Sequence, residues 1–197
     1  MDITIAAKKG YYTEVKKFID KGVKVDTKDK NGDTALILAA LYGHTAIVSL
    51  LIEAGANVNL SNSRGARAVE KAIRGRHIDI IKYLIDHKTC FNMSCPEPLL
   101  IQLAQMDESD LVEHALLYER DVNIKNKYGQ TALFFSVKNK NFKDIALLVS
   151  KGADASIKDN RNVSIYGSMD KTNDDDANDL HLINKVISDA LIDKKNL

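Results

Sequence analysis

The chain of 197 residues contains no tryptophan, two prolines and two cysteines, and each scarcity narrows the choice of fold. Few prolines suit an array of helices, because proline disrupts the interior of a helix. The two cysteines, Cys90 and Cys95, lie five positions apart and do not make the framework of a disulfide-stapled domain. We therefore expect a reducing, cytoplasmic setting.

The chain also has almost no net charge and no long apolar run. Its 28 Lys and Arg residues against 27 Asp and Glu residues give +1, which does not favour nucleic acid as the partner. A membrane-spanning helix needs roughly 18 or more apolar residues in a row, and no segment approaches that length. The start, MDITIAAKKGYY, lacks the basic region and apolar core of a secretory signal. We expect no membrane association and no secretion.

Signatures of catalysis are missing as well. The glycines occur singly and periodically, so they terminate helices and do not form a phosphate-binding loop. His87, Cys90 and Cys95 suggest a metal site, but tetrahedral zinc needs four ligands and no fourth is apparent. The run 174–176 of three aspartates lacks the alternating ligand spacing of a calcium loop. The sequence predicts no enzyme, metal, cofactor or small-molecule substrate.

What the chain does contain is an internal repeat. Gly32 and Gly65 are 33 residues apart, as are His44 and His77. From Gly65 to Gly129 the distance is 64, two short of two periods, so one repeat should carry a two-residue deletion. The weak stretch SCPEPLLIQLAQ is where we place it. Periods of this length are typical of stacked helical repeats.

The clearest repeat, 31–63, reads as two helices. The first is expected from Ala35 to about Leu41, with Asp33 or Thr34 as its N-cap and Gly43 at its end. The second runs from Ala46 to about Ala54 and places aliphatic residues on one broad face. A short loop then leads into the next repeat. One such pair cannot bury its apolar faces alone, so it must stack.

The strings GDTALILAALYGH and GANVN in this repeat resemble the ankyrin repeat, with Ala35 in place of the family's proline and Ile37 in place of its histidine. The resemblance extends over about residues 3 to 160 and is that of a small, stand-alone bacterial ankyrin repeat protein. It implies an all-α ankyrin solenoid of helix-turn-helix units joined by hairpin-like loops, with atypical caps at both ends. The expected single domain, 1–197, comprises units 3–30, 31–63, 64–94, 95–127, 128–160 and 161–197.

The last unit is degenerate. An acidic stretch, 170–179, interrupts it, and we favour a solubilising role for this stretch over one in which it folds back on the preceding units. The segment LHLINKVISDALI follows as a C-terminal capping helix. Its apolar residues at helical spacing are expected to face the preceding unit: Leu180, Ile183, Val186, Ile187, Ala190 and Leu191.

The resemblance also implies where a partner would bind. In ankyrin repeat proteins the concave face consists of the loop tips and the exposed side of the first helices, while the Gly-His histidines, here His44 and His77, tie neighbouring units together. Carrying over the exposed positions gives the predicted partner-binding residues: Lys8, Lys9, Lys30, Asp33, Leu41, Tyr42, Arg64, Arg74, Lys127, Tyr128 and Lys138.

Most of these residues are basic, which predicts a groove for an acidic protein segment, with Tyr42 and Tyr128 as aromatic anchors. The alternative is a set of ordinary solvated lysines. Nucleic acid is a less favoured partner, since few aromatic residues interleave with the charges. The expected function is that of a monomeric adaptor or inhibitor. The alternative is a bacterial or viral effector that engages a host protein through the same face.

Overall fold

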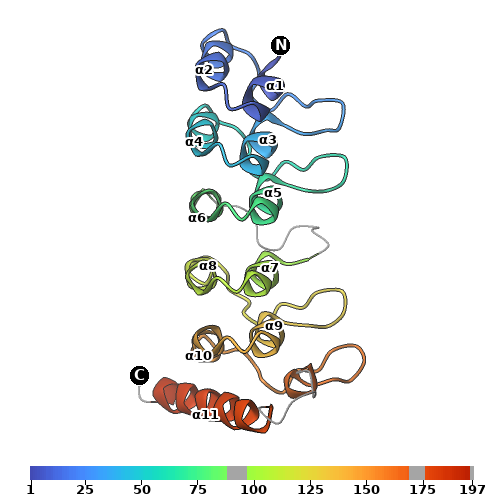
Figure 1. Cartoon of the computed structure of the whole chain (residues 1–197), viewed down its shortest axis with the longest axis vertical. Helices are drawn as coiled ribbons and strands as arrows, with labels where there is room; N and C mark the ends of the chain where they lie inside the picture. The colour runs from blue at the N-terminus through green and yellow to red at the C-terminus, as the bar shows by residue number, and fades with distance from the viewer. Residues whose placement is uncertain (88–96, 169–175, 196–197) are drawn as a thin grey trace. The chain divides into compact units, whose positions relative to one another are not determined.

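The computed structural model of the chain describes residues 1–87, 97–168 and 176–195. They form two compact units, Met1–Cys90 and Phe91–Leu197 (Figure 1). Across the described ranges the secondary structure is helical, apart from two isolated bridges, Lys28 with Thr34 and Lys158 with Ser164. The expected all-α class of stacked helix-turn-helix units is confirmed. The expectation of a single domain stays a prediction, because the boundary between the two units falls within 88–96, outside the described residues.

The first unit contains three helix pairs. The first helices are α1 (Ile3–Lys8), α3 (Ala35–Leu41) and α5 (Ala68–Gly75), and the second helices are α2 (Tyr12–Asp20), α4 (Thr45–Glu53) and α6 (Ile78–Asp86). First helices pack on first helices and second helices on second helices. The loops between pairs project on the side of the first helices away from the second helices (Figure 1).

The second unit repeats this pattern and then departs from it. Its pairs are α7 (Leu99–Met106) with α8 (Ser109–Ala115), and α9 (Ala132–Lys138) with α10 (Phe142–Ser150). A 3₁₀ turn, η1 (Ile165–Ser168), then packs on α9, and the long helix α11 (Asp176–Lys195) packs on α10. The degenerate last unit therefore keeps the stacking scheme but reduces its first helix to one turn.

Local signals explain why α3 begins and ends where it does. The Thr34 hydroxyl accepts a hydrogen bond from the Ile37 backbone N–H at 3.2 Å, so Thr34 is the N-cap and Asp33 is not. Gly43 follows the helix with φ +76°, a left-handed conformation that suits glycine. Ala39 and Ala40 are fully buried, and their small side chains let the neighbouring first helices approach closely.

The two histidines at the predicted tying positions do connect successive repeats. His44 Nε2 lies 3.2 Å from the carbonyl oxygen of Lys8, and His77 Nε2 lies 3.2 Å from that of Leu41. In the second unit Asn141 takes this place, and its side-chain amide donates to Asp107 at 2.7 Å. The prediction of a structural role for both histidines is confirmed.

Helix starts locate the shortened repeat. From α4 to α5 the first residues are 68 − 45 = 23 positions apart, and from α8 to α9 they are 132 − 109 = 23 apart, but from α6 to α7 the distance is 99 − 78 = 21. Because α6 and α4 are both nine residues long, the missing pair falls between Asp86 and Leu99. Most of that stretch, with Cys90 and Cys95, lies outside the described residues.

The C-terminal helix α11 caps the second unit less completely than expected. Ile183, Ile187 and Ala190 are buried as predicted, and Val186 is half-buried. Leu180 and Leu191, however, are 39% and 46% exposed, so the predicted apolar face is too wide. At about 100° per residue, both lie at the same edge of the buried row on the helix surface.

Of the acidic stretch 170–179, residues 170–175 lie outside the described range. At its end, Asp179 forms an ion pair with Lys140 at 2.6 Å, which joins the start of α11 to the turn before α10.

Candidate protein-binding face

The loop tips share one device that fixes their backbone. In each described hairpin an Asp or Asn carbonyl or carboxylate oxygen accepts the backbone N–H groups two and four residues later, at 2.8 to 3.0 Å. This is an Asx turn, in which the side chain stands in for a backbone acceptor. The four described tips therefore share this backbone arrangement, which is centred on Asp29, Asn62, Asn126 and Asp159.

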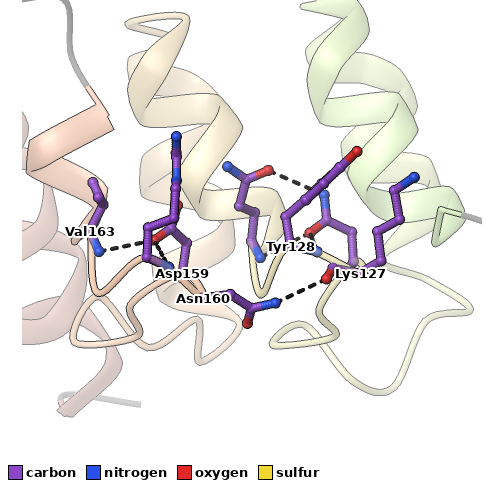
Figure 2. A network of polar contacts seen from close by, with 8 residues as sticks. Lys127, Tyr128, Asp159, Asn160 and Val163 are labelled. Atoms are coloured by element: carbon purple, nitrogen blue, oxygen red, sulfur yellow. Dashed lines mark hydrogen bonds and ion pairs between the residues drawn. The ribbon is translucent and has the colours of Figure 1, made fainter.

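Neighbouring tips are also joined to each other. In the first unit the Ser63 N–H donates to the Asn31 carbonyl at 3.2 Å. The second unit has the equivalent bond, from the Asn160 N–H to the Tyr128 carbonyl at 2.9 Å, and adds one from the Asn160 side chain to the Lys127 carbonyl at 3.0 Å (Figure 2). Side chains carried by these tips are therefore presented on a braced backbone, which reduces the entropy lost on binding.

In the first unit, Lys8 of α1 and Lys30 of the adjoining tip line one groove of about 520 Å³, together with Lys28. The Lys8 ammonium lies 5.7 Å from the centre of the Tyr42 ring, within cation–π range, and Tyr42 is 46% exposed. The structure thus brings together three of the predicted residues, Lys8, Lys30 and Tyr42, on or beside one groove.

The two carboxylates that line this groove are occupied by local hydrogen bonds. Asp2 caps α1, and the Thr4 hydroxyl and the Ile5 backbone N–H lower the pKa of its carboxyl. Asp29 accepts the N–H groups of its own turn. Neither carboxylate is in an ion pair with a groove lysine in the described part of the chain. The groove therefore holds three lysines against two carboxylates, and no ion pair joins them among the described residues.

The other predicted residues of the first unit fall into two groups. Lys9, Arg64 and Arg74 are exposed, as expected for partner-facing side chains. Leu41 is half-buried in α3. Asp33 is only 9% exposed, and its carboxylate accepts the Asn62 side-chain amide at 2.7 Å. This contact places Asp33 between two tips and gives it a structural partner that the sequence interpretation did not include.

In the second unit, Lys127, Tyr128 and Lys138 are all exposed. The Lys127 ammonium lies 4.9 Å from the centre of the Tyr128 ring. Tyr128 also lines a hollow of about 360 Å³ with Gln130, Asn160 and Arg161. Lys138 does not line this hollow.

Sequence reasoning missed Lys28 and Arg161. Lys28 lines the groove of the first unit, and its ammonium donates to the Ser61 carbonyl at 2.8 Å. Arg161 follows Tyr128 by 33 residues and so shares its repeat position. The register could have found Arg161, but the predicted residues stopped one unit short of it.

No chemistry other than binding is apparent in the described parts of the chain. They hold no cluster of three or more His, Cys, Asp or Glu side chains placed to bind a metal ion. The His87 ring, from the suggested metal motif, contacts the Tyr83 carbonyl through Nδ1 at 2.7 Å. Among the helices of the described ranges, none combines the length and apolarity needed to cross a bilayer.

Asp144, in the first turn of α10, is a buried carboxylate on a second helix. It is fully buried, and its carboxylate oxygens make no hydrogen bond with the described residues. Burial raises the pKa of Asp144. The nearby Ser109 hydroxyl and Lys143 ammonium offset part of this rise, although the hydrogen bonds of the Ser109 hydroxyl are with Asn141.

Comparison with known proteins supports the fold. Residues 3–95 match the family model for ankyrin repeats in three copies. A search of curated proteins finds no match. An ankyrin repeat domain from Acinetobacter baumannii superposes with a TM-score of 0.83 at 22% identity, covering 95% of this chain and 96% of that one. The ankyrin repeat protein EF0377 gives 0.76 at 28% identity, with 96% of each chain covered.

A further similar structure comes from a complex. It is that of the predatory endopeptidase Bd0816 from Bdellovibrio bacteriovorus with the immunity protein Bd3460. The matched chain gives a TM-score of 0.77 at 24% identity, with 95% of this chain and 96% of that chain covered. At that identity the likeness establishes the shared fold.

Proposed function

The chain is an ankyrin repeat protein, and from that premise we propose that it binds a partner protein of acidic surface through its loop tips and first helices. The observation that carries the proposal is the groove lined by Lys8, Lys28 and Lys30 beside Tyr42. Its three lysines outnumber the two carboxylates, Asp2 and Asp29, and pair with neither, so an acidic segment would find a net positive lining.

The remaining predicted cations support the same partner chemistry. Lys9, Arg64, Arg74, Lys127 and Lys138 are exposed, and none forms an ion pair with another described residue. Unpaired exposed cations steer an acidic partner and speed its association.

Within this binding role we favour an adaptor or inhibitor that acts in the cytoplasm as a monomer. The inhibitor role is supported by analogy with the endopeptidase–immunity protein complex that contains a chain of similar fold. The low cysteine content fits a reducing compartment.

Affinity capture with charge-reversed variants tests the proposal. The immobilised full chain is incubated with lysate of the source cells at low salt, as wild type, as Lys8→Glu with Lys30→Glu, and as Arg64→Glu with Arg74→Glu. A control reverses Lys16 and Lys21, which lie on or next to the second helix α2 and are also exposed. All three variants change the net charge by the same four units.

We expect a captured protein that the control retains and the other two variants lose by about tenfold or more in affinity. The captured protein should carry a net negative surface, and its binding should weaken with added salt. If the control variant loses as much as the groove variants, net charge alone governs capture and the proposed face is wrong.

A further inference from the structure

The hollow beside Tyr128 in the second unit contains an arginine held in a fixed position. The Arg161 Nε and Nη2 groups donate to one carboxylate oxygen of Asp159, at 3.1 and 2.9 Å. The Asp159 side chain is 1% exposed, whereas that of Arg161 is 74% exposed. A buried carboxylate thus anchors a guanidinium that points into solvent.

Asp159 is fixed in turn by its own loop. Its second oxygen accepts the backbone N–H groups of Arg161 and Val163, both at 2.9 Å (Figure 2). Burial alone would raise the pKa of Asp159, but the hydrogen bonds from Val163 and Arg161 outweigh it and hold the pKa below its ordinary value. The carboxylate stays ionised near neutral pH, so the anchor persists.

The anchored arginine keeps unused donors. A guanidinium has five N–H groups, and Asp159 takes two of them. No other described residue accepts from the remaining three, which include both on Nη1. Two parallel N–H groups of a guanidinium match the two oxygens of a carboxylate, and such charge-assisted pairs are among the stronger hydrogen bonds in proteins.

Tyr128, which also lines the hollow, is suited to contact an apolar side chain adjacent to a bound acidic residue. Tyr128 is 57% exposed, and its backbone is held by Asn126 at 2.9 Å and by Asn160 at 2.9 Å. Lys127 lies over its ring. Exposed aromatic rings on a fixed backbone are typical anchors for an apolar side chain of a partner.

We infer that Arg161, Tyr128, Gln130 and Asn160 form a subsite that takes one Asp or Glu side chain of a partner segment, while an adjacent apolar side chain packs on Tyr128. The positive charges of Lys127 and Arg161 and the negative charge of Asp159 sum to +1 at this subsite, which favours a ligand side chain with a single negative charge. The inference rests on the proposed function and specifies the partner sequence that the second unit would recognise.

A nuclear magnetic resonance titration of the full chain tests this subsite. The probe is the blocked dipeptide N-acetyl-Glu-Phe-amide, followed through the Arg161 Nε–H and the Gln130 backbone N–H signals. We expect saturable shifts with a Kd of about 1 mM, the usual range for so small a ligand. N-acetyl-Gln-Phe-amide, which lacks the charge, should bind at least about tenfold more weakly.

Two variants and a control complete the design. Arg161→Lys keeps the charge but loses the planar fork, and should weaken the Glu-Phe probe several-fold. Tyr128→Ala should leave N-acetyl-Glu-Phe-amide binding no tighter than N-acetyl-Glu-Ala-amide. Arg120→Gln removes another exposed arginine of the same unit and should change nothing.

The inference is overturned if no signal saturates, if the Gln probe binds as well as the Glu probe, or if both variants bind like wild type. Inorganic phosphate that binds more tightly than the Glu probe would overturn the carboxylate assignment. Failure here leaves the proposed function standing, because capture through Lys8 and Lys30 depends on the first unit. In contrast, if the groove variants captured the partner no worse than the control variant, the proposed function would be rejected even if the dipeptide bound at the subsite.

Discussion

Substitution of Gly43 by alanine gives a sharp test of how the repeats are tied together. Gly43 has φ +76°, where a side chain costs roughly 1 kcal/mol. A Cβ atom at Gly43 would also lie 2.6 Å from Cε1 and 2.9 Å from Nδ1 of the His77 ring, far inside van der Waals contact. The ring would have to move, which breaks its 3.2 Å contact with the Leu41 carbonyl.

The backbone cost at Gly43 and the lost His77 contact add together. A lost hydrogen bond costs about 1 kcal/mol, so Gly43→Ala should lower the free energy of unfolding by about 2 to 3 kcal/mol. Gly55 is the matched control in the same unit, since it has φ +87° but no atom within 4 Å of its added Cβ. Gly55→Ala should therefore cost only the backbone term, about 1 kcal/mol.

Urea unfolding followed by circular dichroism at 222 nm measures both costs. Combining Gly43→Ala with His77→Ala removes the clash, so in that background the cost of Gly43→Ala should fall to about 1 kcal/mol. Equal costs for Gly43→Ala and Gly55→Ala would refute the reasoning. So would a Gly43→Ala cost that does not change when His77 is absent.

Three further substitutions have expected outcomes. The Asn62 side-chain nitrogen lies 2.7 Å from a carboxylate oxygen of buried Asp33, so Asn62→Asp would place two carboxylates against each other. Urea unfolding should show the first unit destabilised by about 2 kcal/mol at pH 7, and by less at pH 4. Asp144→Asn should stabilise by on the order of 1 kcal/mol at pH 7, because it removes a buried charge. Since the folded pKa of Asp144 is raised, the wild type loses this penalty as pH falls through that pKa, and the gain should shrink. Ala39→Asp, at a fully buried contact between first helices, should abolish hydrogen-exchange protection in α1 and α5 together with α3; loss confined to α3 would show that the repeats do not depend on one another.

Much of the fold was predictable because its signals are local. The bounds of α3 match the prediction, since a threonine cap and a glycine stop act within one helix. The second helix α4 begins and ends one residue earlier than expected. His44 and His77 were also assigned correctly, because the repeat register fixes which carbonyl each ring meets.

What the sequence did not reveal depends on contacts between repeats. Asp33 looked like a surface residue, and only the Asn62 amide, 29 positions later, makes it structural. The exposure of Leu180 and Leu191 follows from how α11 lies on α10, which the periodicity of one helix does not determine. Arg161 shares the repeat position of Tyr128 and could have been found by register, but its anchoring by Asp159 becomes evident only in the folded hairpin.

Hydrogen–deuterium exchange of the chain with and without the captured partner tests the central claim most directly. If the loop tips and first helices bind the partner, protection should rise in the tips around Asp29–Lys30 and Ser63–Arg64 and at the end of α1, while α2, α4 and α6 stay unchanged. Protection that rises on the second helices and leaves the tips unaffected would contradict the account.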